Sequence, residues 1–139
     1  MNKIIRMEEV PEQYDLAGKV IGLAMKVHSA LGSGFLESVY QSALALELRR
    51  AGLKVEAEKP VSVRYEGELV GAFVADLLVN DVLIVETKAI QMLAKIHEVQ
   101  LVNYLVATGI NEGLLLNFGA ERLEFKKKFR RPKQETVSL

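Results

Sequence analysis

The sequence predicts an α/β fold in which helices flank a mixed central β-sheet. In the first third of the chain, apolar residues recur every three or four positions, which is the period of an amphipathic helix. Further along, apolar runs are bounded by turn residues, which is the pattern of strands. The expected elements are helices at about 16–31, 36–51 and 94–108 and strands at about 54–65, 68–79, 82–88, 113–117 and 123–129. This order of elements is typical of an α/β sandwich.

Each expected helix has a residue that starts or ends it. Asp15 is the expected N-cap of the first helix, because its side chain can accept a hydrogen bond from a free backbone N–H. Gly32 and Gly34 end that helix, since glycine readily adopts the conformation that follows a helix. Gly52 ends the second helix and Gly109 ends the third.

Turn residues separate the expected strands. Glu66-Gly67 lies between the first two strands, and Asn80-Asp81 joins the second and third as a hairpin. Pro60 indicates a sheet edge, a bulge or a break, because proline has no N–H to donate to a neighbouring strand. The third strand begins with Val82-Leu83-Ile84-Val85, a run typical of a strand that is buried on both faces.

The composition is that of one ordinary globular domain. The chain has 139 residues, of which 50% are hydrophobic and 26% are charged. We therefore expect a single domain over residues 1–139 with a core at about 15–129. The absence of cysteine excludes disulfides and zinc–thiolate sites. The N-terminus has no signal-peptide pattern and no apolar run approaches membrane-spanning length, so we expect a cytoplasmic protein without a membrane partner.

Basic residues crowd the C-terminal end, although the net charge of the chain is zero. They are Arg122, Lys126, Lys127, Lys128, Arg130, Arg131 and Lys133. Two interpretations stay open. The cluster contacts phosphate groups, or it belongs to a solubilising basic tail at residues 130–139.

Charged residues interrupt two of the buried runs. Glu86 and Lys88 leave the same face of one strand, one pleat apart. Asp76 interrupts the preceding strand, and the hairpin brings it close to both. Burial of charge is costly unless the charge is paired or bound to a metal, so this group needs a chemical reason. Glu37 heads the apolar stripe of the second helix and is expected to face the same pocket.

This set of side chains suits a magnesium or manganese site. Asp76 and Glu86 supply hard oxygen ligands, and the backbone carbonyl of Thr87 is a further expected ligand. Glu37 completes the metal shell directly or through water. The metal lowers the pKa of a bound water, and Lys88 orients that water or stabilises the charge that develops on phosphate.

A polar face of the third expected helix adds to this pocket. His97, Gln100 and Tyr104 share that face by helical spacing. Gln100 and Tyr104 are expected to position the phosphate or the nucleophile. His97 has no second histidine nearby, so we interpret it as a hydrogen-bonding residue of the helix face rather than as a metal ligand.

Each candidate also has a structural interpretation. Asp76, Glu86 and Lys88 would form a buried ion-pair network, but such networks often give little net stability, which favours the metal site. Glu37 would instead cap a helix or pair with a lysine. Gln100 and Tyr104 would be ordinary residues of a helix surface.

An ordered set of motifs indicates a family. Gly34-Phe35-Leu36-Glu37-Ser38-Val39-Tyr40 fits the pattern Gly-x-x-Glu-x-x-Tyr, and Asp76, Glu86-Thr87-Lys88 and the segment 96–104 follow it. With these motifs the chain resembles the bacterial GxxExxY proteins, which are grouped with the PD-(D/E)xK, restriction-endonuclease-like nuclease superfamily. The resemblance runs from about residue 15 to residue 129. It implies a restriction-endonuclease-like sandwich.

The resemblance also implies roles for single residues. Asp76 resembles the first acidic metal ligand of the superfamily, Glu86 the second, and Lys88 its catalytic lysine. Glu37 resembles the acidic residue that many members add from a helix, and Gln100 and Tyr104 match a Gln-x-x-x-Tyr element. Ala75 replaces the proline of the superfamily's name, which binds nothing.

These observations predict a Mg²⁺- or Mn²⁺-dependent nuclease that hydrolyses DNA phosphodiester bonds. A homodimer is a further expectation, since cutting two strands often requires two sites related by a twofold axis. One alternative is a nuclease-fold module that binds nucleic acid or a protein without cutting it. Another is a small-molecule phosphohydrolase that uses the same metals.

Overall fold

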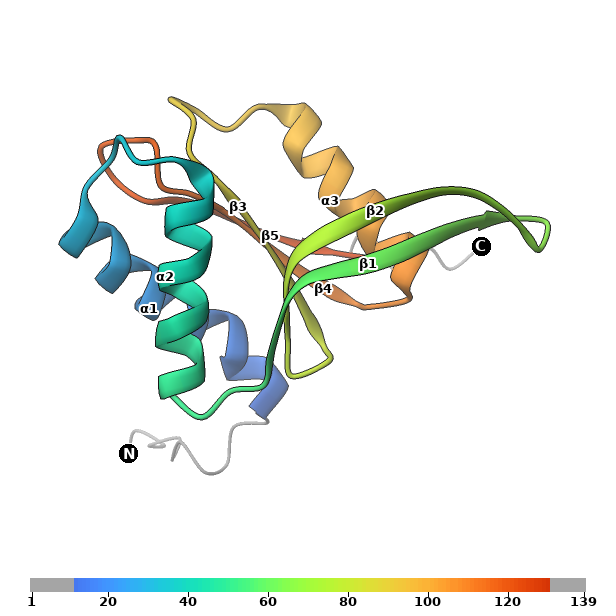
Figure 1. The fold of residues 1–139 in the computed structure, drawn as a ribbon, viewed down its shortest axis with the longest axis horizontal. Coiled ribbons are helices and arrows are strands. Elements are labelled where there is room, and N and C mark those ends of the chain that lie inside the picture. Colours follow the sequence, from blue (N-terminus) through green and yellow to red (C-terminus); the bar gives the residue numbers. More distant parts are fainter. Residues whose placement is uncertain (1–11, 131–139) are drawn as a thin grey trace, which may run out of the picture.

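The structure, a computed structural model, describes residues 12–130, and its elements follow the predicted order (Figure 1). The helices are α1 (Glu12–Leu31), α2 (Glu37–Arg50) and α3 (Lys95–Thr108). The strands are β1 (Val55–Tyr65), β2 (Glu68–Val79), β3 (Leu83–Lys88), β4 (Glu112–Asn117) and β5 (Glu124–Phe129). The predicted tail at 130–139 lies, apart from Arg130, outside the described residues.

The strands form one mixed sheet in the order β1-β2-β3-β4-β5. Neighbouring strands run antiparallel except β3 and β4, which run parallel. A parallel connection requires a crossover, and α3 supplies it. The expected α/β class with a mixed central sheet is therefore confirmed.

Helices cover both faces of the sheet (Figure 1). On one face, α1 and α2 bury a large apolar cluster against the inner strands, with Tyr40, Leu77, Val85 and Leu116 at its centre. On the other face, α3 packs through Leu101 and Leu105 on a smaller cluster. This arrangement buries β3 and β4 on both faces, which explains their nearly unbroken apolar sequences.

Some element boundaries differ from those expected. Helix α1 begins at Glu12, three residues before Asp15, so Asp15 is not its N-cap. The physical reason is that residues 12–14 contain no glycine or proline to stop the helix from extending backwards. Helix α2 begins at Glu37, and its N-cap Leu36 makes no side-chain cap hydrogen bond.

The hairpin turns have the expected conformation. Asn80 and Asp81 have φ angles of 50° and 60°, and the Val82 N–H donates to the Val79 carbonyl over 3.1 Å. Positive φ at both central residues is the signature of a type I′ turn, whose twist matches that of the strands. Glu66 and Gly67, with φ of 50° and 81°, form the corresponding turn between β1 and β2.

The β1–β2 hairpin extends beyond the body of the molecule as an arm (Figure 1). Tyr65, Leu69 and Val70 near its tip are 66%, 59% and 60% exposed. Strand β1 is an edge strand and contains Pro60. The edge interpretation of Pro60 is therefore confirmed.

Candidate functional site

The candidate site lies where β2 and β3 separate. Their ladder pairs Val79 with Leu83, Leu78 with Ile84 and Leu77 with Val85, and it ends there. Asp76 and Glu86 come directly after the last pair. The Asp76 backbone N–H donates to Glu86 Oε2 over 2.7 Å. A side-chain bond thus replaces the ladder bond, and the two predicted ligands lie in direct contact.

Thr87 fixes the carboxylate of Asp76. Its backbone N–H and its hydroxyl both donate to Asp76 Oδ2, over 2.8 and 3.1 Å. Thr87 is fully buried, so neither donor can turn to water. Burial raises the pKa of Asp76, while the Thr87 hydrogen bonds and the charge of Lys88 oppose that rise. We predicted only the carbonyl of Thr87 at this site, whereas the structure shows its N–H and hydroxyl in contact with Asp76.

Glu86 is the most strongly perturbed acid in this group. It is 7% exposed, and burial raises its pKa to about 8. The negative charge of Asp76 contributes to this rise, while the hydrogen bond from the Asp76 backbone and the charge of Lys88 oppose it. A carboxyl group that is buried beside a second carboxyl group is poised to exchange its proton for a cation.

Glu37 approaches this pair from α2. It occupies the first turn of that helix, where the positive end of the helix dipole favours a carboxylate. Burial raises the pKa of Glu37; Lys88 and His97 lower it and Asp76 raises it. Electrostatic coupling to Lys88, Asp76 and Glu86, which are all predicted site residues, places Glu37 in the same charged cluster.

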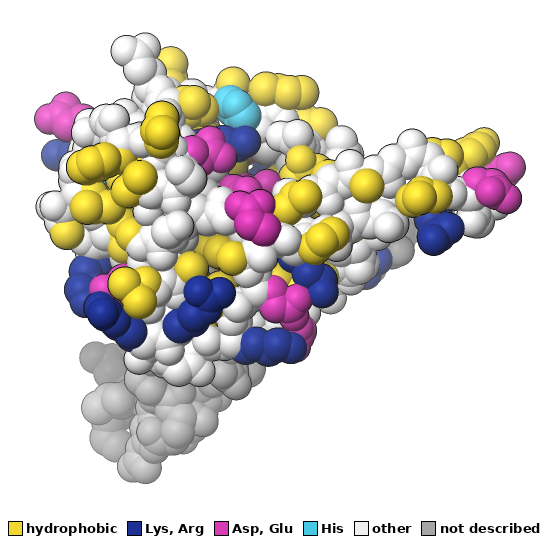
Figure 2. Space-filling model, viewed as in Figure 1, with side chains coloured by type: hydrophobic (Ala, Val, Ile, Leu, Met, Phe, Trp, Pro, Cys, Tyr) yellow, Lys and Arg dark blue, Asp and Glu magenta, His cyan; other side chains and the backbone are white. Residues whose placement is uncertain are grey.

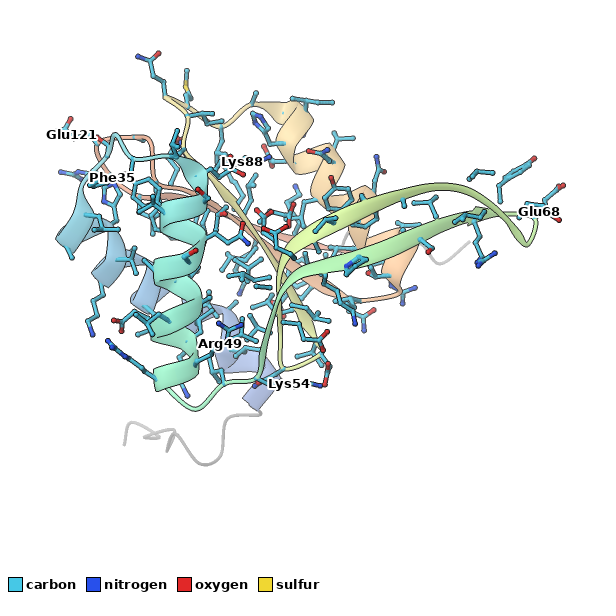
Figure 3. All side chains as sticks on the ribbon, viewed as in Figure 1. Phe35, Arg49, Lys54, Glu68, Lys88 and Glu121 are labelled. Carbon is cyan, nitrogen blue, oxygen red and sulfur yellow. The ribbon has the colours of Figure 1, made fainter. Side chains whose placement is uncertain are left out.

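Lys88 lies at the end of β3, between the N-terminal end of α2 and α3 (Figure 3). Its charge lowers the pKa of Glu37, Asp76 and Glu86 alike. In the part of the chain that the structure describes, no carboxylate approaches its Nζ closely enough for an ion pair. The buried ion-pair network is therefore not formed in this conformation. Figure 2 shows acidic side chains gathered where α2, β2 and α3 meet.

The polar face of α3 reaches the site in part. Tyr104 stacks on Phe73 of β2, with ring centroids 3.7 Å apart, and the charges of Glu86 and Asp76 add to the effect of burial in raising its pKa. His97 accepts a hydrogen bond at Nδ1 from the Ala94 backbone, as expected of a helix-face residue. Gln100 is exposed one turn before Tyr104, and within residues 12–130 it makes no direct hydrogen bond.

Asn117 fixes the chain just after Lys88, and we did not predict it. It pairs in register with Lys88 and is fully buried. Its Oδ1 accepts from the Ile90 and Gly119 backbones, each over 3.0 Å. A Cβ on Gly119 would lie 2.3 Å from the Ile90 nitrogen, so only glycine allows this close approach. The available sequence signal was that Asn117 is the polar residue that ends the apolar run of β4.

Gln41 and Glu58 are two further neighbours of Asp76 that sequence reasoning missed. Gln41 Nε2 donates to Glu58 Oε1 over 2.8 Å and to the Asp76 carbonyl over 3.3 Å. Glu58 has a φ of 54°, a conformation that costs a non-glycine residue about 1–3 kcal/mol. The available signal for Gln41 was its position one turn after Glu37 on the same helix face.

The donor chemistry of the site fits a hard divalent cation. Among the hydrogen bonds of residues 12–130, none reaches Asp76 Oδ1 or Glu86 Oε1. Each predicted ligand therefore has one oxygen held by the protein and one that remains available. In the described range, no three histidine, aspartate or glutamate side chains lie close enough to surround an ion in this conformation. The donor set is present, and a complete cage is not.

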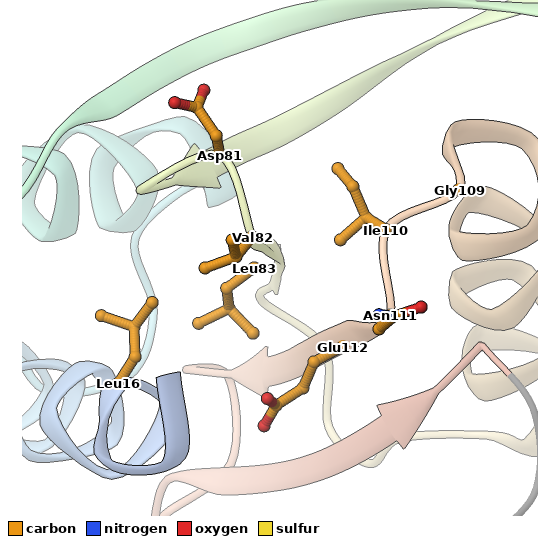
Figure 4. Close-up of a pocket in the computed structure, with 8 residues that line it drawn as sticks. All are labelled: Leu16, Asp81, Val82, Leu83, Gly109, Ile110, Asn111 and Glu112. Carbon is orange, nitrogen blue, oxygen red and sulfur yellow. The ribbon is translucent and has the colours of Figure 1, made fainter. Parts of the chain in front are cut away.

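One cavity of the described residues lies away from the candidate site. Figure 4 shows this cavity of about 180 Å³ between Leu16, the β2–β3 turn and the segment that precedes β4. It lies beside Leu83, and Lys88 is five residues further along β3, about 16 Å at the usual rise of a strand. The candidate site lies at the opposite end of β3.

The basic cluster is partly neutralised. Lys128 Nζ lies 3.1 Å from Glu98 and Lys127 Nζ lies 3.9 Å from Glu112. Both acids precede the cluster in sequence and reach it only through the fold. The predicted members Arg131 and Lys133 lie outside the described residues.

In residues 12–130, no helix combines the length and the apolar character needed to cross a membrane.

The comparisons with known proteins give one match. The family model of the PD-(D/E)XK nuclease superfamily matches residues 14–131. Neither the comparison with curated proteins nor the comparison with solved structures finds a match. The mixed five-stranded sheet between helices agrees with the restriction-endonuclease-like fold of that superfamily. The match covers most of the sequence and includes every candidate residue described above, so the chain belongs to the PD-(D/E)XK nuclease superfamily.

Proposed function

We propose that this protein is a nuclease that hydrolyses DNA phosphodiester bonds with Mg²⁺ or Mn²⁺. The observation that supports the proposal best is the contact between Asp76 and Glu86 at the open end of the β2–β3 hairpin. Each carboxylate keeps one oxygen outside the hydrogen bonds of the described chain. In a chain of this superfamily, such a pair is best explained as a cation site.

The metal would be held by side chains from two elements. Asp76 and Glu86 are the proposed direct ligands, with the Thr87 carbonyl beside them, and Glu37 on α2 is the proposed further ligand, directly or through water. The bound ion supplies a water of lowered pKa and polarises the phosphate. Because the pKa of Glu86 is raised, a cation held here would displace a proton, and its affinity would rise with pH.

Lys88 has the proposed role of contacting the reacting groups. Its ammonium is not tied to any carboxylate, so it is available to orient a water or to stabilise charge on the phosphate oxygens. This statement covers residues 12–130. Tyr104 and Gln100 are proposed to position the nucleic acid from α3. We also propose that the chain is a bacterial GxxExxY protein, that it is a single-domain cytoplasmic protein, and that it forms a homodimer.

The decisive experiment compares cleavage and metal binding. Wild-type protein is incubated with single-stranded DNA, duplex DNA and RNA in Mg²⁺, Mn²⁺ or excess chelator, and products are separated by size. We expect metal-dependent cleavage of DNA. Lys88→Met is expected to slow cleavage at least about 100-fold, because a charge that contacts the transition state is lost. The Mn²⁺ affinity of Lys88→Met, measured by calorimetry, should equal that of wild type, because Lys88 is not a proposed metal ligand.

Two results would contradict the proposal. Cleavage that persists in excess chelator excludes the metal role. Cleavage by Lys88→Met at the wild-type rate excludes the assigned mechanism. A Lys95→Met variant, which removes an exposed lysine at the start of α3, is the matched control and should cleave normally.

A second candidate function is a nuclease-fold module that binds nucleic acid without cutting it. It is favoured by the incomplete cage, since no three acidic or histidine side chains of the described range converge closely enough to surround an ion. Measurable DNA binding without Mn²⁺ binding and without cleavage would support this function.

A further inference from the structure

Gln41 joins three elements at the backbone of Asp76. It lies on α2, one turn after Glu37, and is half-buried. Its Nε2 donates both to Glu58 Oε1 on β1 and to the Asp76 carbonyl on β2. An amide group that donates two hydrogen bonds fixes the relative positions of a helix and two strands.

The β1–β2 ladder is irregular at this point. Ala57 pairs with Leu77 and Lys59 pairs with Ala75, but Glu58 and Asp76 between them do not pair. Glu58 has the left-handed φ noted above, so β1 departs from regular strand geometry opposite Asp76. The peptide groups of Asp76 are consequently bound by side chains. Its N–H donates to Glu86 and its carbonyl accepts from Gln41.

Opposite Glu58, the side chains along β2 do not alternate strictly between the two faces of the sheet. Ala75 and Leu78 both pack in the α3-side cluster, whereas strict alternation would send residues of odd and even number to opposite faces. Leu77 and Val79 pack on the α1–α2 side. The alternation therefore breaks at Asp76, and the orientation of its carboxylate depends on how its backbone is held.

We propose that Gln41 is a positioning residue that, with Glu58 as its second acceptor, holds the Asp76 backbone so that the N–H meets Glu86 and the carboxylate stays turned towards Thr87. The inference rests on the proposed function in one respect, because this orientation matters for activity only if Asp76 binds the metal. Gln41 touches no reacting group and acts through Asp76.

The first test measures the backbone around Asp76 without metal or substrate. Gln41→Met keeps the length of the side chain and removes both donors. Amide hydrogen exchange of Asp76 and Thr87 should accelerate at least tenfold relative to the amides of the intact ladder at 77–79 and 83–85. Glu47→Met on the same helix removes the 2.9 Å contact with Lys26 and serves as the matched control. Equal exchange in Gln41→Met and wild type overturns the proposal, and so does equal acceleration in Glu47→Met.

The second test measures Mn²⁺ affinity by calorimetry in a mutant cycle. Gln41→Met should weaken binding about 10–100-fold, the usual effect of losing a group that orients a ligand. Glu58→Gln and Glu58→Met both remove the charge, but only Glu58→Gln keeps an acceptor for Gln41. We expect Glu58→Gln to bind Mn²⁺ more tightly than Glu58→Met, and we expect this difference to vanish in the Gln41→Met background. If the two Glu58 variants still differ in Mn²⁺ affinity in the Gln41→Met background, Glu58 does not act through Gln41 and the proposal is overturned.

The two proposals fail separately. A wild-type protein that binds Mn²⁺ but cuts no nucleic acid contradicts the proposed function and leaves the role of Gln41 intact. A wild-type protein that binds no Mn²⁺ also contradicts that function, and the exchange measurement alone then decides for or against the role of Gln41. Normal cleavage by Gln41→Met with unchanged exchange contradicts only the positioning role.

Discussion

The two ends of the β2–β3 hairpin are built differently. Near the turn, three consecutive residue pairs form a regular ladder, and their side chains are buried and apolar. At the other end the ladder stops, and Asp76 and Glu86 bind each other through a side chain and a backbone N–H. The comparison teaches that regular pairing satisfies the backbone and leaves nothing to react. At the interruption, each of the two carboxylates keeps one oxygen outside the hydrogen bonds of the described chain.

Two aspartates of the hairpin give the sharpest test of this difference. Asp76 is half-buried at the open end, whereas Asp81 is exposed in the turn and contacts Lys54 over 2.9 Å. Asp76→Asn should abolish Mn²⁺ binding and slow DNA cleavage at least about 100-fold, because a metal ligand contributes several kcal/mol to the transition state. Asp81→Asn should leave both within twofold. Similar losses in the two variants, measured by calorimetry and product analysis, would remove the distinction between the two ends.

Stability should respond in the opposite way. Leu83→Ala removes a fully buried side chain from the regular end and should lower the free energy of unfolding by about 2–5 kcal/mol. Mn²⁺ affinity of the folded protein should change little. Glu86→Gln removes a buried carboxyl group that takes up a proton on folding, and it should preserve or increase stability at neutral pH while Mn²⁺ binding is lost. Urea unfolding measures both variants. A Glu86→Gln protein as unstable as Leu83→Ala would make Glu86 a structural residue.

The pH dependence of stability should originate at the open end. The pKa of Glu86 is about 8 in the folded protein against 4.5 for the ordinary group, so the folded state binds this proton more tightly. The stability that this group contributes is complete below pH 4.5 and is lost as the pH rises to about 8. The slope from one group is at most about 1.4 kcal/mol per pH unit.

Urea unfolding between pH 4 and 9 checks this expectation. Asp76 and Glu37 also have raised pKa values and add to the fall in the same direction. Saturating Mn²⁺ should offset the loss at high pH, because the ion replaces the proton. The curve of Glu86→Gln should be flatter than that of wild type, and identical curves would contradict the assignment of the proton to Glu86.

The smallest effect is expected in the turn. Asp81→Gly relieves a φ of 60° and loses an exposed ion pair with Lys54, and these two changes nearly cancel. The melting temperature should therefore shift by only a few degrees, and Mn²⁺ affinity should not change. A large loss of Mn²⁺ affinity in Asp81→Gly would show that the turn and the open end of the hairpin are coupled, which would contradict the distinction between them.

Local patterns in the sequence were sufficient for most of the fold. The aliphatic run that begins at Val82 predicted a buried central strand, and Asn80-Asp81 predicted the tight turn, because both depend on the intrinsic preferences of a few adjacent residues. The start of α1 was wrong, since helix boundaries depend on how far a permissive segment extends beyond the best capping residue. Asp76, Glu86 and Lys88 were identified by the rarity of charge in buried runs.

The sequence by itself therefore determined the order of the elements, the hairpin and the identity of the charged side chains. Only the tertiary structure decided which neighbours hold them. Gln41 and Asp76 are 35 positions apart, and Lys88 and Asn117 are aligned by parallel pairing across a crossover helix. Likewise, no pattern of neighbouring residues predicts the left-handed backbone of Glu58 or the close contact of Gly119 with Ile90. The physical reason is that hydrogen bonds between distant segments depend on packing, which no short stretch of sequence specifies.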